Sequence, residues 1–133
     1  MRSVKELISR VLSDIQARLP EILDRRGLKS FEKYAIGNSV EKQELALYVK
    51  ISEFTRRGET ATFIIQAQLP SNEIEMNEYM DAVNEYLEDC FLPEKAGYLD
   101  FGYSTAITDN ERASTIDVFW EVTLSSALDD CSM

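Results

Sequence analysis

The sequence predicts an α+β fold: a single sheet of about five mostly antiparallel strands with two helices on one face. Two stretches repeat apolar residues at helical spacing, and five others alternate or concentrate apolar residues as strands do. Their order along the chain is α-β-β-β-α-β-β. The 133 residues suffice for one domain, and we assign residues 1–124 to it and residues 125–133 to a flexible tail.

The first element is a helix. Apolar side chains recur every three or four positions over residues 4–19, which places them on one stripe of the helix. Pro20 has no N–H to donate, so the helix is expected to end or kink near Leu19. Residues 21–26 then add a further turn or two before Gly27.

Three strands are expected next, over residues 31–36, 44–52 and 60–69. The second of these alternates aliphatic and mostly polar side chains, as a half-buried antiparallel strand does. Arg56 and Arg57 lie between the second and third strands. We therefore place this arginine pair at the tip of a β-hairpin.

The second helix is expected over residues 74–91, and its exposed surface is acidic. No lysine or arginine occurs within it, so the usual ion pairs along a helix are missing and like charges repel. A broken local rule of this kind tends to mark a functional surface. The acidic residues are Glu75, Glu78, Asp81, Glu85, Glu88 and Asp89.

Two strands are expected to close the domain, over residues 98–107 and 114–124, with a loop at 108–112. In the last strand Phe119 points opposite to Trp120, so one large aromatic side chain must lie on the face away from the helices. Tyr48 is expected on the same outward face. Aromatic residues on that face of a sheet indicate an interface, or else a tail of the chain that covers them.

Composition excludes several classes of function. With Lys+Arg 14 against Asp+Glu 24, the formal net charge is -10, which opposes binding to nucleic acid. The charge is uneven: residues 1–70 carry +3 and residues 71–133 carry -13. Copies arranged head to tail would bring these unlike surfaces together. The alternative is a solvated acidic surface that keeps the protein soluble.

Nothing in the sequence points to catalysis. There is no histidine, no glycine-rich phosphate loop and no nucleophile with an evident base, so we expect no enzyme activity, no cofactor and no metal site. Cys90 and Cys131 are far apart and are expected to be free thiols. No run of 18 apolar residues and no signal-peptide pattern occurs, so a cytoplasmic protein without a membrane segment is expected.

The element order resembles the tail terminator and tail-completion proteins of long-tailed bacteriophages and prophages. The resemblance rests on the amphipathic first helix, the charged hairpin, a strand ending in Leu69-Pro70, the acidic helix, and the closing strand at residues 116–124. It implies a homo-oligomer, a hexameric ring in that family, that caps the tail tube and contacts the head–tail connector. It also implies assembly in the bacterial cytoplasm and a final place in the virion tail.

Two other families share part of this order. Class I type III secretion chaperones are small acidic dimers with an α-β-β-β-α-β-β core that bind effector segments, but they continue into a further helix for which residues 125–133 offer little material. Double-stranded RNA-binding domains share the α-β-β-β-α start, but they need a basic second helix.

We therefore expect a structural protein that acts through its surfaces. The candidate interface combines the hairpin arginines, the outward aromatic residues and part of the acidic helix. Its residues are Arg56, Arg57, Tyr48, Glu78, Asp81, Glu85 and Phe119.

Overall fold

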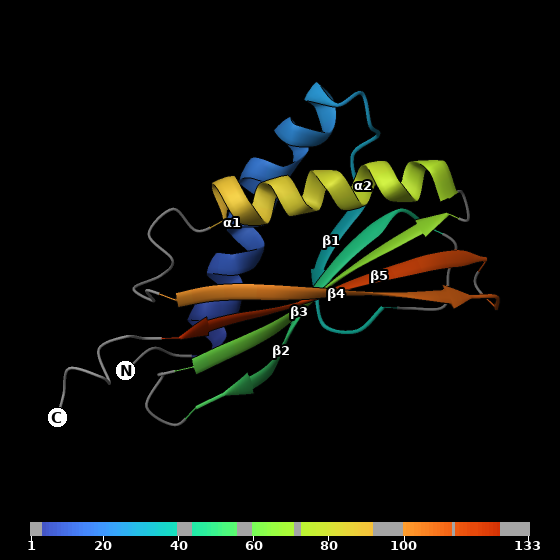
Figure 1. Ribbon diagram of the computed structural model, residues 1–133. Coiled ribbons are helices and arrows are strands. Elements are labelled where there is room, and N and C mark those ends of the chain that lie inside the picture. Colours follow the sequence, from blue (N-terminus) through green and yellow to red (C-terminus); the bar gives the residue numbers. More distant parts are fainter. Residues whose placement is uncertain are drawn as a thin grey trace, which may run out of the picture.

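A computed structural model describes residues 4–39, 44–55, 60–70, 73–91, 100–112 and 114–125. These residues form one five-stranded sheet with two helices on one side, which confirms the predicted class (Figure 1). The elements are α1 (Val4–Arg25), β1 (Lys33–Ile36), β2 (Ala46–Phe54), β3 (Thr60–Pro70), α2 (Glu73–Glu85) with the π-helical turn η1 (Tyr86–Cys90), β4 (Asp100–Asn110) and β5 (Thr115–Ser125).

The strands lie side by side in the order β1-β2-β3-β5-β4. Three neighbouring pairs are antiparallel, and β1 runs parallel to β2. The expected hairpin of β2 and β3 is present, although its tip, with Arg56 and Arg57, lies outside the described residues. In this order β1 and β4 form the two edges of the sheet.

The sequence left open an end or a kink of the first helix near Leu19, with a further turn or two after it, and the structure excludes the end. The helix continues through Pro20 to Arg25. Ile22 and Leu23 extend its buried stripe into the core. We attribute the continuation to this burial, which offsets the backbone hydrogen bond lost at the proline.

The second helix ends in a wider turn than expected. Phe91 N–H donates to the carbonyl of Tyr86, five residues earlier, at 2.8 Å. The wider turn brings the rings of Tyr86 and Phe91 to the same buried side, with their centroids 5.9 Å apart. A regular α-helical turn would have placed Cys90 there, four residues after Tyr86.

The prediction of a loop over residues 108–112 is wrong for its first three residues. Thr108, Asp109 and Asn110 belong to β4 and pair with Asp117, Ile116 and Thr115 of β5, respectively. The expected tail lies outside the described residues except for Ser125, which is the last residue of β5.

Both helices pack on the same face of the sheet, and α2 lies across α1 (Figure 1). The core between helices and sheet is apolar, and Trp120 is its largest fully buried side chain. The opposite face, which we call the outer face, is partly covered by the connection from β1 to β2. Ser39 and Glu44 of that connection both accept hydrogen bonds from outer-face glutamines of β3, at 3.0 and 3.1 Å.

Candidate interaction surfaces

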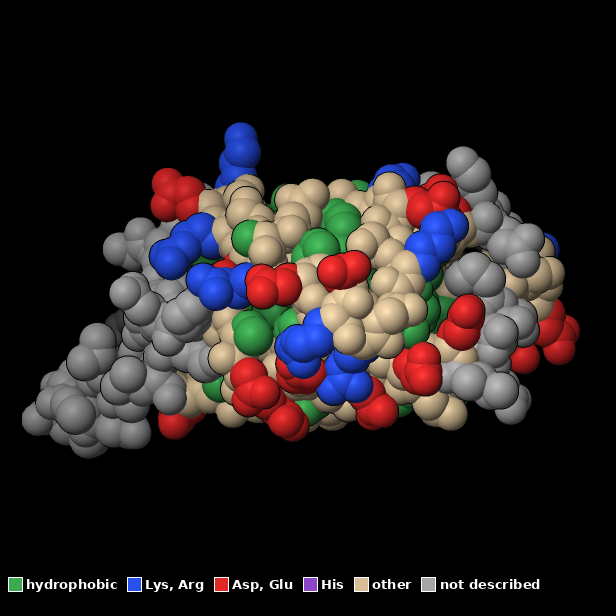
Figure 2. Space-filling view, turned by 90° about the horizontal axis from the view of Figure 1, so that it is seen from above, with side chains coloured by type: hydrophobic (Ala, Val, Ile, Leu, Met, Phe, Trp, Pro, Cys, Tyr) green, Lys and Arg blue, Asp and Glu red, His purple; other side chains and the backbone are tan. Residues whose placement is uncertain are grey.

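The exposed side of α2 is acidic, as predicted. Glu78 and Asp81 are exposed, and neither forms an ion pair with another described residue. Figure 2, which looks onto the helix-covered side, shows acidic side chains in a row along the side of the molecule where α2 lies, with basic side chains among them. This surface suits a partner that carries positive charge.

Glu85 differs from its neighbours on α2. Its carboxylate accepts hydrogen bonds from Arg25 at 2.5 Å and from Arg26 at 2.7 Å, so it ties the end of α1 to α2. The helix itself contains no lysine or arginine, as the sequence shows, but Glu85 is paired with two arginines at the end of the first helix. These hydrogen bonds, from Arg25 first and then from Arg26, lower the pKa of the Glu85 carboxyl below its usual range.

We expect Glu85→Gln to lower the urea midpoint at pH 7, because two guanidinium groups lose their carboxylate. A carboxyl with a lowered pKa in the folded state adds stability above its unfolded pKa of about 4.3, and that stability is lost as pH falls. The difference in urea midpoint between wild type and Glu85→Gln should therefore become smaller below about pH 4. Urea unfolding at pH 3.5, 5 and 7 measures this.

Glu78→Gln is the matched control, because Glu78 lies on the same helix and is exposed without an ion pair among the described residues. Equal midpoints for Glu85→Gln and Glu78→Gln at pH 7 would contradict a stabilising role for the Glu85 bridge.

Tyr48 points away from the helices, but its expected exposure is wrong. Its side chain is only 2% exposed, and its hydroxyl donates to Glu44 at 3.2 Å. The ammonium group of Lys33 lies 5.4 Å from the centre of its ring. Tyr48 thus belongs to the covered part of the outer face and is not available as an interface residue.

Phe119 lies on the outer face and Trp120 in the core, which confirms that the two aromatics divide between the faces. Phe119 is half-buried, between Gln66 of β3 and Ala106 of β4. Arg56 and Arg57 lie outside the described residues. Of the predicted interface residues, Glu78, Asp81 and Phe119 therefore remain accessible, although the helix acids and Phe119 occupy opposite faces of the sheet.

The sequence reading missed the two edges of the sheet. Ile36 on β1 is 50% exposed and Ile107 on β4 is 51% exposed, more than any other large aliphatic side chain in the described residues. Ser104–Asp109 of β4 are all exposed. The start of β4 is in contact with the end of the second helix, through Phe101 against Phe91 and through Tyr103, which donates to Glu88 of η1. One feature of the sequence is consistent with an exposed edge at β4: residues 101–108 are uncharged, although 29% of the residues in the chain are charged.

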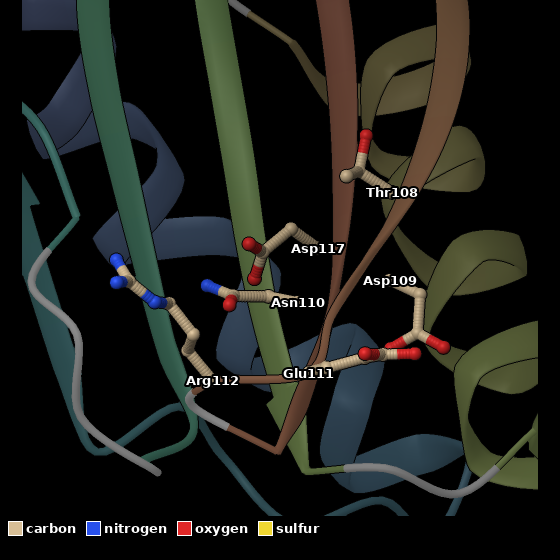
Figure 3. Close-up of a pocket in the computed structure, with 6 residues that line it drawn as sticks. All are labelled: Thr108, Asp109, Asn110, Glu111, Arg112 and Asp117. Atoms are coloured by element: carbon tan, nitrogen blue, oxygen red, sulfur yellow. The ribbon is translucent and has the colours of Figure 1, made fainter.

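A polar pocket of about 380 Å³ lies at the turn between β4 and β5. Figure 3 shows Asn110, Arg112 and Asp117 on one side of this hairpin, with Asp109 and Glu111 pointing to the other. Asp117 is 5% exposed, and burial raises the pKa of its carboxyl. The hydroxyl of Thr115 donates to it at 3.3 Å. The acids of the pocket diverge, so they do not converge on a common ligand.

Within the described ranges, no group of three histidine, cysteine, aspartate or glutamate side chains could hold a metal ion. None of the helices described is both long and apolar enough to cross a membrane. Comparison with models of known protein families and with characterised proteins gives no match for this chain.

Proposed function

We propose that this chain is a non-enzymatic structural protein of a bacteriophage or prophage tail, similar in role to a tail terminator. Its copies assemble into a ring that caps the tail tube and contacts the head–tail connector. One observation carries the proposal: the sheet ends in two different edges, β1 and β4, and each carries an isoleucine that is about half exposed.

Two different contact surfaces at the two edges of the sheet favour head-to-tail assembly. Such an interface generates a closed ring when the rotation between neighbours closes, and a filament when it does not. The charge of the chain is uneven, because residues 1–70 carry +3 and residues 71–133 carry -13. Copies arranged head to tail would bring these unlike parts together.

A head-to-tail ring also has two chemically different faces. That property suits a protein placed between two partners, the end of a tail tube and a head connector. If copies meet through their sheet edges, Glu78 and Asp81 on α2 stay accessible for a partner with a basic surface. Assembly would take place in the bacterial cytoplasm, and the ring would remain in the virion tail.

The experiment that tests this function uses the tail-tube protein encoded near this chain's gene, since phage tail genes lie together. Purified chain carrying a gold label is added to growing tubes and viewed by negative-stain electron microscopy. We expect label at one end of each tube and an end to tube growth. Label distributed along the tubes, or tubes that grow unchanged, would contradict the proposal.

The alternative is a dimer that resembles class I type III secretion chaperones and binds effector segments. A dimer of that kind uses the same surface on both copies. It would leave one of the two sheet edges unused, and its mass would not depend on a tube. The mass measurement described at the end of the Discussion separates the two functions.

A further inference from the structure

We infer that β1 of one copy pairs with β4 of the next copy, so that the sheet continues from subunit to subunit. This inference rests on the proposed head-to-tail assembly and names the surface that carries it. Edge strands present unpaired backbone N–H and C=O groups that readily accept another strand. Natural proteins protect such edges with very short strands, lysine, proline, bulges or a cover. β1 is short and carries Lys33, whereas residues 101–108 of β4 contain neither a charge nor a proline.

The strand directions fit this pairing. β1 is parallel to β2, and each step from β2 to β3, β5 and β4 is antiparallel, so β1 and β4 run in opposite directions. Two copies that stand side by side in the same orientation therefore bring β4 of one against β1 of the next as an antiparallel pair. Antiparallel pairing is the slightly more stable arrangement.

The faces of the sheet fit as well. Ile36 pairs with Val49 and Ile107 pairs with Val118, and both valines belong to the core beneath the helices. The two exposed isoleucines therefore point to the same side of a continued sheet. Placing Ile36 opposite Ile107 removes the exposed apolar surface of both side chains from water, which favours the contact.

The main rival of this pairing is a contact of β4 with β4 of a second copy. That contact would use the same edge on both copies and leave β1 open, so it could not continue the sheet from one subunit to the next.

Disulfide cross-linking tests the inference. Opposed residues of an antiparallel pair have Cα atoms about 4.5–5.5 Å apart, which is within the range of a disulfide. In a background where Cys90 and Cys131 are replaced by serine, Ile36→Cys and Ile107→Cys are made singly and together. After mild oxidation, we expect the double variant to give a ladder of covalent oligomers on a denaturing gel, and each single variant to give none.

Each other outcome overturns the pairing in its own way. Covalent dimers from Ile107→Cys alone would show the β4–β4 contact. If the double variant forms rings but no cross-links, the assembly uses other surfaces. That result would contradict the pairing of β1 with β4 but not the proposed function. The absence of any assembly in the wild type would instead remove the proposed function itself.

A surface substitution gives an independent measurement. Ile107→Lys places a desolvated charge in the proposed interface, and we expect it to weaken self-association at least 10-fold without a change in the thermal midpoint of the isolated chain. Val4→Lys is the control, because Val4 is 38% exposed and lies on α1, not on either edge strand. Equal association for the two variants would contradict the inference.

Discussion

Trp120→Ala is expected to lower the free energy of unfolding by about 3–5 kcal/mol, the range found for large aromatic side chains deleted from a core. Trp120 is 0% exposed and lies between the central strands and α2. Its indole N–H donates to the side-chain oxygen of Asn84 at 2.8 Å, so the truncation also removes a bond between sheet and helix. A single domain is stable by about 5–15 kcal/mol in total, so this loss is large.

Phe119→Ala is the matched control, since Phe119 is the adjacent residue in β5 but lies half-buried on the outer face. We expect Phe119→Ala to lower the free energy of unfolding by less than about 1.5 kcal/mol, because the space left by the ring is open to solvent. Urea unfolding followed by circular dichroism measures both variants without relying on tryptophan fluorescence. A larger cost for Phe119→Ala than for Trp120→Ala would show that the two faces have been assigned the wrong way round.

Tyr86→Phe is expected to lower the free energy of unfolding by about 1.5–3 kcal/mol, the range for a hydrogen bond to a charged group. The buried phenol of Tyr86 donates to Asp14 at 2.5 Å and so joins α2 to the middle of α1. Burial, and then the hydrogen bond to Asp14, raises the pKa of Tyr86 well above its usual value. Above about pH 10 the phenol ionises more readily in the unfolded chain, so the wild type loses stability as pH rises.

The variant lacks this titration, so its stability should fall less steeply than that of the wild type between about pH 9.5 and 11. Tyr103→Phe serves as the control, because Tyr103 donates to Glu88 at an exposed site and should cost less at pH 7. Urea midpoints across this pH range provide the comparison. Equal costs for the two variants at pH 7 would contradict the role of the buried Tyr86 bond.

The order of the elements could be predicted because it depends on local periodicity. Each strand and helix shows its own spacing of apolar residues, and the division of Phe119 and Trp120 between faces follows from alternation alone. Element ends were less certain because they depend on neighbours. β4 extends to Asn110 because Thr115 of β5 pairs with it, and α1 passes Pro20 because Ile22 and Leu23 have a core to enter.

The candidate surfaces depended more on distant contacts. Arg25 and Arg26 are 60 and 59 residues away from Glu85, so the bridge between them cannot be read from spacing within one helix. Tyr48 is covered on the outer face, where Glu44 accepts its hydrogen bond and Ser39 accepts one from Gln66. The exposure of Ile107 follows from the place of β4 at the sheet edge, and strand order is not a local property of the sequence.

Head-to-tail self-assembly into a closed ring is tested most directly by the mass of the wild-type chain in solution. Light scattering during size-exclusion chromatography is performed over a range of protein and salt concentrations, with and without tail-tube protein. We expect one discrete assembly, with six times the 15.2 kDa chain mass as the size implied by the tail terminator family, and we expect Ile107→Lys to reduce it. A dimer that persists at every protein and salt concentration, or a monomer even with the tube present, would contradict the ring.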